Sequence, residues 1–311
     1  MSHGRVDTHH HVLPPAYRNW LIERRLYKSP PVAWSVSRAL QVLDEKGIRT
    51  AIVSTAPIGL RLDPRDRAPK AREVNEYTAE MAKDYPDRFG FFASLPLPDV
   101  DATLEEIRVA FDEFGADGAL LPTNVHGRYL GAAEFEPVFE ELDRRRAVLF
   151  THPTGGGFPP APGIPLYVAG HLLDTVRTAI DLVRTGRTSR FPNVRIILSN
   201  GGGFVPYAAH RMGTSLAAWG GLTASEVVEQ LRGFYFDTAL AASPYSLPSL
   251  LAFAKPGHLL YGCDWPFSEE EIPYFDGFLD AHPMTAEQRD AVDFGNALAL
   301  FPRLAAQAAD A

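Results

Sequence analysis

Short runs of apolar and β-branched residues alternate along this chain with segments whose apolar residues recur every three or four positions. Such runs are typical of buried strands, and the three-to-four spacing is typical of amphipathic helices. The run at residues 50–54, for example, is followed by Ala71, Val74, Thr78 and Met81 at helical spacing. The same alternation continues to the end of the chain. Further strands are predicted to start at Val6 and to occupy residues 89–95, 118–121, 147–150, 194–198, 234–236 and 259–261.

Eight predicted strands separated by helices favour an α/β fold with a parallel sheet, because strands buried on both faces read as continuous apolar runs. Eight such units in a chain of 311 residues are typical of a distorted (β/α)8 TIM barrel. A doubly wound open sheet is the alternative. We expect one domain over residues 1–311, with extra helices after the first strand and a helical extension at the C-terminus. In a barrel, functional side chains gather at the carboxyl ends of the strands.

The overall charge narrows the choice of partners. The chain carries a formal net charge of −8, with a pI near 5.7. A net acidic surface repels polyphosphates, so nucleic acid and anionic membranes are not expected as partners. The single cysteine, Cys263, excludes an intrachain disulfide framework. No apolar run reaches transmembrane length and no leader is recognisable, so we expect a cytoplasmic protein.

Polar side chains that suit a metal ion follow three of the predicted strands. Asp7, His9 and His11 end the first, and residues two apart on a strand point to the same face. His152 and Asp264 follow the strands at 147–150 and 259–261, so a closed barrel can bring all of these together. Three imidazoles and a carboxylate suit Zn²⁺, or Mn²⁺ or Fe²⁺ with added water. The alternatives are a tag remnant at the N-terminus, structural histidines, and an aspartate that caps a helix.

Several segments in order along the chain resemble the amidohydrolase superfamily, and specifically its metal-dependent decarboxylase branch. That branch contains aminocarboxymuconate semialdehyde decarboxylase and γ-resorcylate decarboxylase, and the likeness is greatest to the 6-methylsalicylate decarboxylases. The likeness covers nearly the whole chain. The matching segments are residues 6–11 with Pro14 and Pro15, 90–96, 129–131, 147–154, 195–199, 234–239 and 256–266.

The resemblance implies a ligand set and a reaction. It assigns His9, His11, His152 and Asp264 as ligands of one divalent ion, Zn²⁺ or Mn²⁺. The implied reaction is the non-oxidative decarboxylation of a small aromatic hydroxy acid of the salicylate type, such as 6-methylsalicylate. It also implies a homodimer in which Arg211 reaches into the partner subunit's site, although Arg211 could equally be an ordinary arginine on a helix surface.

Two positions depart from the family pattern. Asn200 stands where the family normally has a histidine, and asparagine cannot carry a proton near neutral pH. Ala39 and Gln41 stand where the semialdehyde decarboxylase has arginines for a second carboxylate, which favours a monocarboxylate substrate. By resemblance to γ-resorcylate decarboxylase, Asp264 could serve both as ligand and as proton shuttle. Two alternatives to a decarboxylase remain. The chain could be a metal-dependent hydrolase, or it could be a metal-binding protein without activity. In the second case, Asn200 is either natural or an introduced inactivating substitution.

Aromatic residues supply candidates for the wall of a substrate pocket. Trp265 lies next to the proposed ligand Asp264, and Phe92 lies in the predicted strand at 89–95. Most aromatic residues of a barrel belong to its core, which is the competing interpretation of both.

Overall fold

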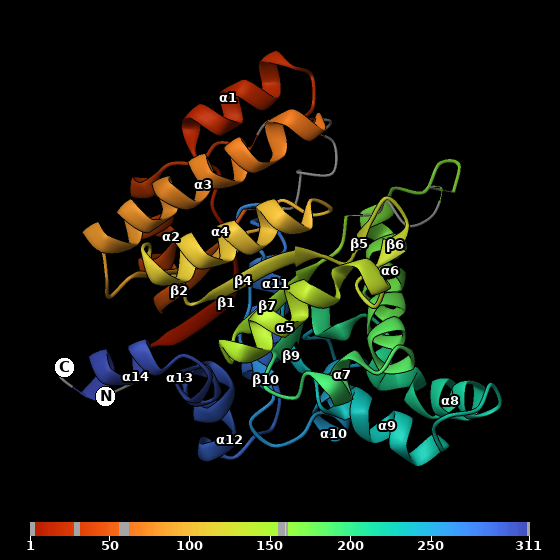
Figure 1. The fold of residues 1–311 in the computed structure, drawn as a ribbon. Coiled ribbons are helices and arrows are strands. Elements are labelled where there is room, and N and C mark those ends of the chain that lie inside the picture. The colour runs from red at the N-terminus through yellow and green to blue at the C-terminus, as the bar shows by residue number, and fades with distance from the viewer. Residues whose placement is uncertain (1–3, 28–31, 56–61, 155–158, 160, 310–311) are drawn as a thin grey trace.

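The computed structural model describes residues 4–27, 32–55, 62–154, 159 and 161–309 (Figure 1). Eight parallel strands form one sheet, and neighbours in the sheet follow one another along the chain apart from a small inserted hairpin. The eight strands are β1 (Arg5–His11), β2 (Ile48–Ser54), β3 (Phe89–Ser94), β4 (Gly118–Pro122), β7 (Val148–His152), β8 (Arg195–Leu198), β9 (Tyr235–Asp237) and β10 (Leu259–Leu260).

The sheet closes on itself where the chain leaves β10. The backbone of Thr8 donates to the carbonyl of Tyr261 at 3.0 Å, and that of His11 donates to the carbonyl of Trp265 at 2.7 Å. In return, the backbone of Asp264 donates to the carbonyl of His9 at 2.7 Å. These bonds join the first and last strands of the sheet. They confirm the distorted (β/α)8 barrel and rule out the open sheet that was the alternative.

Helices surround the barrel, as Figure 1 shows. Two helices follow β1, and short helices follow β10 at the C-terminal end of the chain. A two-stranded hairpin, β5 (Asn124–Val125) and β6 (Arg128–Tyr129), is inserted after β4 and was not predicted. The helices are α1 (Pro15–Glu23), α2 (Val36–Glu45), α3 (Pro64–Asp84), α4 (Val100–Asp112), α5 (Glu136–Arg144), α6 (Leu166–Arg184), α7 (Arg187–Arg190), α8 (Val205–Ala217), α9 (Ala224–Arg232), α10 (Leu247–Phe253), α11 (Ile272–Ala281), α12 (Ala286–Asp290), α13 (Asn296–Leu300) and α14 (Pro302–Ala309).

The barrel interior is apolar up to the carboxyl ends of its strands. Phe301, which lies between α13 and α14, contacts Phe92 of β3, with ring centroids 5.9 Å apart. Phe92 stacks on Phe150 of β7 at 5.3 Å, and Phe150 lies 5.0 Å from the ring of His9. The C-terminal helices therefore close the amino end of the barrel, and polar side chains begin one layer above Phe150. The same cluster includes Val6, Ile52, Leu120, Val148, Ile197, Leu260, Ala297, Leu300 and Leu304.

At the amino end of the barrel, Arg5 ties β1 to the C-terminal helices. Its guanidinium group pairs with Asp276 at 3.4 Å, with Asp293 at 3.1 Å and with Asp280. It also lies 4.6 Å from the centre of the Tyr261 ring. Burial raises the pKa of Asp276 to about 6, although the charge of Arg5 acts in the opposite direction.

This shift makes the folding stability depend on pH in a defined direction. The unfolded chain releases the Asp276 proton near pH 4 and the folded chain near pH 6, so stability falls as pH rises between these values. The free energy of unfolding of Asp276→Asn, relative to that of the wild type, should rise by up to about 3 kcal/mol between pH 4 and pH 7. Urea unfolding at both pH values measures this gain. Asp280→Asn, which removes the more exposed carboxylate on the same arginine, should show a much smaller change; equal changes would contradict the prediction.

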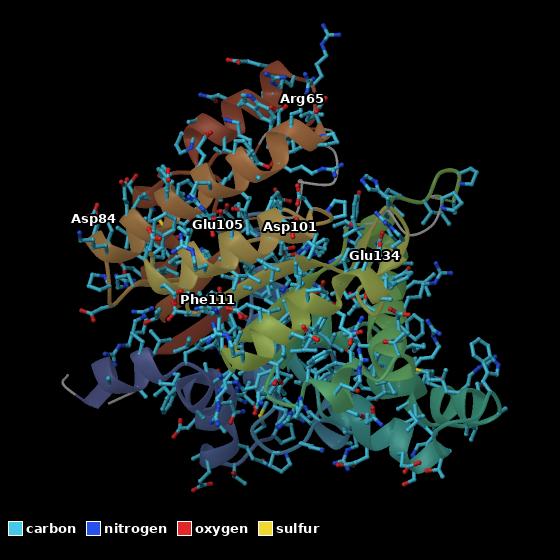
Figure 2. The ribbon with its side chains drawn as sticks, in the orientation of Figure 1. Arg65, Asp84, Asp101, Glu105, Phe111 and Glu134 are labelled. Carbon is cyan, nitrogen blue, oxygen red and sulfur yellow. The ribbon has the colours of Figure 1, made fainter. Side chains whose placement is uncertain are left out.

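Charged side chains cover the outer helices. Figure 2 shows Asp84 and Arg65 at opposite ends of α3, and Glu105 of α4 is exposed. Among the residues that the structure describes, no helix is both long and apolar enough to cross a membrane.

Candidate metal centre

Four predicted ligands from three parts of the chain meet at the carboxyl end of the barrel. One donor atom from each of His9, His11, His152 and Asp264 lies within 4.8 Å of all the others. The imidazole ring centroids are 4.9 to 5.2 Å apart, and the rings meet edge to face. The distances from Asp264 Oδ1 to His9 Nε2 and His11 Nε2 are 3.3 and 3.0 Å. The barrel therefore brings together the predicted set of metal ligands.

Two potential donor atoms of this cluster lack hydrogen-bond partners. His9 Nε2 and His11 Nε2 are fully buried, and neither has a well-formed hydrogen bond in the described part of the chain. An unsatisfied buried nitrogen costs free energy, and a cation between the rings would remove that cost. Three imidazole nitrogens with one carboxylate oxygen are a donor set that suits Zn²⁺ or Mn²⁺. These residues therefore fit one divalent ion.

A bulge in β1 aims its two outer histidines into the barrel. In the pairing with β2, Asp7 lies opposite Ala51 and His10 lies opposite Val53, so three steps on β1 match two on β2. A bulge of this kind reverses which residues face inward beyond it. His9 and His11 consequently face the interior. Asp7, which simple alternation places on their face, lies instead with His10 on the other side.

Hydrogen bonds hold three of the four predicted ligands in place. His11 Nδ1 donates to the carbonyl of Ser54 at 3.1 Å, and His152 Nδ1 donates to the carbonyl of Pro153 at 3.1 Å. Ser268 Oγ donates to Asp264 Oδ2 at 2.9 Å. With Nδ1 engaged in this way, Nε2 of each ring is the nitrogen left for a metal ion.

Asp237 at the end of β9 orients the remaining imidazole, and the sequence interpretation gave it no role. Its carboxylate is fully buried, and its Oδ2 lies 2.8 Å from His9 Nδ1. The strand-end rule could have found it, because it directly follows the predicted strand at 234–236.

The electrostatics of the cluster call for a positive charge. Burial would lower the pKa of His9, but the carboxylates of Asp237 and Asp264 outweigh it and raise that pKa to about 10. Burial, together with the neighbouring imidazoles, holds the pKa of His152 well below its usual range. Although burial opposes ionisation of Asp264, the nearby His9 and His11 lower its pKa well below the ordinary value. Two buried carboxylates need a compensating cation, either a proton on His9 or a metal ion.

Asn200 lies beside the cluster without a hydrogen bond to its four members. Its backbone donates to Asp237 Oδ1 at 2.8 Å, and its Nδ2 donates to the carbonyl of Ala239 at 3.3 Å. Its φ of 54° is in the left-handed region, where Asn, Asp and His are the commonest residues after glycine. Asp264 has a φ of 61°. The backbone at position 200 therefore suits either asparagine or the histidine of the family pattern.

The other predicted site residues lie apart from the cluster. Trp265 is fully buried on the opposite side of the chain from Asp264, where its ring lies 4.9 Å from that of His10 and its Nε1 donates to Glu269 at 3.1 Å. Phe92 is 2% exposed and lies beneath Phe150. Arg211 is exposed on α8. The structure brings none of these three into the cluster, and their roles in substrate binding stay predictions.

A second group of polar side chains lies behind β1. Asp7 Oδ2 accepts hydrogen bonds from His10 Nδ1 at 2.9 Å and from Cys263 Sγ at 2.8 Å. Burial, reinforced by the Asp7 carboxylate, raises the pKa of the Cys263 thiol well above its usual value. These contacts join β1 to the chain beyond β10, so this group fixes the ends of the barrel beside the ligands.

Comparison with known proteins identifies a family and relatives that match nearly the whole chain. The family model described as amidohydrolase matches residues 6–303. A 6-methylsalicylic acid decarboxylase from Penicillium expansum is 39% identical, with 97% of each chain covered. A γ-resorcylate decarboxylase from Rhodococcus jostii is 28% identical, with 84% of this chain and 86% of that protein covered.

Solved structures share the fold over almost the full length. A crystal structure described as an amidohydrolase II has a TM-score of 0.89 and 28% identity, with 96% of this chain and 99% of that chain covered. A dihydroxybenzoic acid decarboxylase from Polaromonas sp., solved with manganese and 2-nitroresorcinol, has a TM-score of 0.79 and 22% identity, with 96% and 97% covered. These matches confirm the resemblance drawn from the motifs: the chain belongs to the amidohydrolase family.

Proposed function

We propose that this chain is a metal-dependent decarboxylase that removes the carboxylate from a small aromatic hydroxy acid of the salicylate type. The observation that carries the proposal is the buried cluster of three imidazoles and one carboxylate at the barrel mouth. The full-length similarity to a 6-methylsalicylic acid decarboxylase supports this substrate class. Ala39 and Gln41 on α2 add no positive charge, which favours a monocarboxylate. We also propose a cytoplasmic setting, in keeping with the buried free thiol of Cys263.

One divalent ion, Mn²⁺ or Zn²⁺, is the proposed cofactor, held by His9, His11, His152 and Asp264. The manganese in the dihydroxybenzoic acid decarboxylase structure supports Mn²⁺ as the first choice to test. Such an ion, when bound, supplies Lewis-acid stabilisation of negative charge on the phenolic oxygen. His11 and His152 must be neutral to bind it, and burial favours their neutral form by lowering both pKa values.

The proposed reaction needs a proton at the ring carbon that bears the carboxylate. Once that carbon is protonated, the bond to the carboxylate breaks, its electrons return to the ring, and carbon dioxide leaves. We propose that Asp264 carries this proton as well as binding the ion, because Asn200 cannot do so. Ser268, which donates to Asp264 Oδ2, would hold that oxygen in place. Asn200 would hydrogen-bond an oxygen of the substrate.

Carbon dioxide release tests this proposal directly. Protein loaded with Mn²⁺ or with Zn²⁺ is incubated with 6-methylsalicylate, salicylate and 2,6-dihydroxybenzoate. We expect release from at least one acid and none after chelation. The same ligands could activate water for hydrolysis, so a parallel set of amides and lactones is included. Turnover of that set without any carbon dioxide release would replace the decarboxylase proposal by the hydrolase one.

Asn200 favours a second candidate, a metal-binding protein that lacks decarboxylase activity. The variant Asn200→His separates the two, since its backbone conformation tolerates histidine. If only Asn200→His releases carbon dioxide, the wild-type chain is inactive. If both proteins release it, Asn200 belongs to a working enzyme, which is the result that we expect.

We also propose a homodimer, with Arg211 contributed to the partner subunit's site. The same helix, α8, exposes Tyr207 at 87%, and Trp219 just beyond it is 79% exposed. Contiguous exposed apolar patches mark interaction surfaces, and we propose that these two side chains belong to one such patch. We expect Tyr207→Glu to shift the sedimenting species from dimer to monomer and to lower activity. Tyr274→Glu, at an exposed tyrosine of α11, is the matched control, and an unchanged dimer in both variants would contradict this surface.

A further inference from the structure

Asp237 uses both of its carboxylate oxygens, and it uses them for different parts of the site. Oδ2 lies 2.8 Å from His9 Nδ1. Oδ1 accepts from the backbone N–H groups of Asn200 at 2.8 Å, Ala239 at 3.1 Å and Gly201 at 3.4 Å. The side chain is fully buried, so water cannot replace these partners. One carboxylate therefore contacts both a metal ligand and the loop that carries Asn200.

The contact with His9 determines which ring nitrogen can bind a cation. A carboxylate opposite Nδ1 keeps the proton on that nitrogen, and the lone pair then lies on Nε2. Nε2 is the atom that lies 3.3 Å from Asp264 Oδ1 inside the cluster. Asp237 thus holds His9 in the form that ligation requires.

The contact with the loop determines where residue 200 stands. Residues 200 to 203 all have φ between 54° and 71°. The backbone N–H groups of the first two, Asn200 and Gly201, both point to Oδ1 of Asp237, whereas Gly202 and Gly203 donate to backbone carbonyls within the loop. The loop also packs closely against β9, because a Cβ on Gly202 would lie 2.8 Å from the ring of Phe236. Moving the carboxylate would remove two backbone hydrogen bonds of the loop and change the position of residue 200.

We propose that Asp237 is a positioning residue that couples the metal ligand His9 to the Asn200 loop. Retention of the metal ion and placement of residue 200 then change together. This inference rests on the metal site of the proposed function but not on the reaction or the substrate.

An asparagine at position 237 cannot satisfy both sides. If its amide oxygen faces the backbone N–H groups of Asn200 and Ala239, its NH₂ group faces His9 Nδ1. The proton of His9 must then move to Nε2, which blocks ligation. If the amide is turned round, its NH₂ group meets the backbone N–H groups and leaves them unpaired. Asp237→Asn therefore disrupts either the metal ligand or the loop while it changes the volume little.

The test compares Asp237→Asn with Asp174→Asn, a matched change at another buried carboxylate. Asp174 on α6 is fully buried and accepts from the side chains of Asn124 and Tyr129, and in the described part of the chain none of its hydrogen bonds is to a side chain of the four predicted ligands. Mn²⁺ affinity is measured from the electron paramagnetic resonance signal of the free ion. We expect Asp237→Asn to weaken Mn²⁺ binding about 10- to 100-fold and Asp174→Asn to leave it within about twofold. Equal affinities in Asp237→Asn and wild type, or equal losses in both variants, would overturn the proposal.

Amide hydrogen exchange supplies a second readout that needs no variant. In wild-type protein, Mn²⁺ should slow exchange at Asn200, Gly201 and Ala239, because ligation of His9 fixes Asp237. The amide of Gly127, which donates to the side chain of Asn124 in the hairpin, is the control. Slowing at Gly127 alone, or at none of these amides while Mn²⁺ is bound, would contradict the coupling. A wild type that binds neither Mn²⁺ nor Zn²⁺ would overturn the metal site itself, whereas bound metal without carbon dioxide release would overturn only the reaction.

Discussion

Replacing His11 by alanine is expected to lower carbon dioxide release by at least about 10³-fold. The change removes one of three imidazoles and leaves Asp264 Oδ1 without its neighbour at 3.0 Å. The Lewis-acid contribution of a bound ion is worth several kcal/mol, and a 10³-fold loss corresponds to about 4 kcal/mol. Metal content after dialysis should fall in parallel. Elemental analysis measures the metal content, and a carbon dioxide assay measures the activity.

The control for this prediction is a histidine elsewhere in the barrel. His258 precedes β10, stacks on Tyr235 with ring centroids 4.1 Å apart and hydrogen-bonds the carbonyl of Phe234. His258→Ala should lose some stability but keep the bound metal and the activity. If His11→Ala keeps its metal and most of its activity, the cluster is not the metal centre.

The barrel could be predicted from the sequence because most of its strands are apolar on both faces. Runs such as residues 147–150 and 194–198 lie between the helices and the barrel interior, so neither face needs polar residues. The closure bonds from Thr8 and His11 to the chain beyond β10 carried no such signal, since they join backbone groups that any residue could supply. The hairpin β5–β6 gave no such signal either, because strands of two residues are too short to show a hydrophobic alternation.

The cluster of predicted ligands could be foreseen from the strand ends, but the face on which each residue lies could not. Simple alternation puts Asp7 on the face of His9 and His11, and the β1 bulge moves it to the opposite side. A bulge depends on the register with β2, which the sequence of one strand does not contain. Trp265 lies next to a ligand in sequence, yet neighbouring residues point in opposite directions, so it stacks on His10 instead.

Gly262 is expected to be as sensitive as a ligand, although it has no side chain. A Cβ at this position would lie 2.8 Å from the Cβ of His9 and 3.1 Å from that of Asp237. Such contacts are too close, so Gly262→Ala must displace His9, Asp237 or the backbone that follows β10. We expect Mn²⁺ affinity and activity to fall by about 10²-fold and stability by about 1–3 kcal/mol. A metal titration and thermal unfolding measure the two effects.

Gly277 provides the matched control for a glycine-to-alanine change. It lies within α11, and no atom that would meet its Cβ lies within 4 Å. Alanine is the better helix former, so Gly277→Ala should raise stability by about 0.5–1 kcal/mol and leave metal binding unchanged. Both variants exchange glycine for alanine, so stability changes of opposite sign would reflect the different surroundings of the two positions. If Gly262→Ala instead binds Mn²⁺ as the wild type does, His9 can shift without losing the ion. The close packing of Gly262 against β1 would then not be what positions His9.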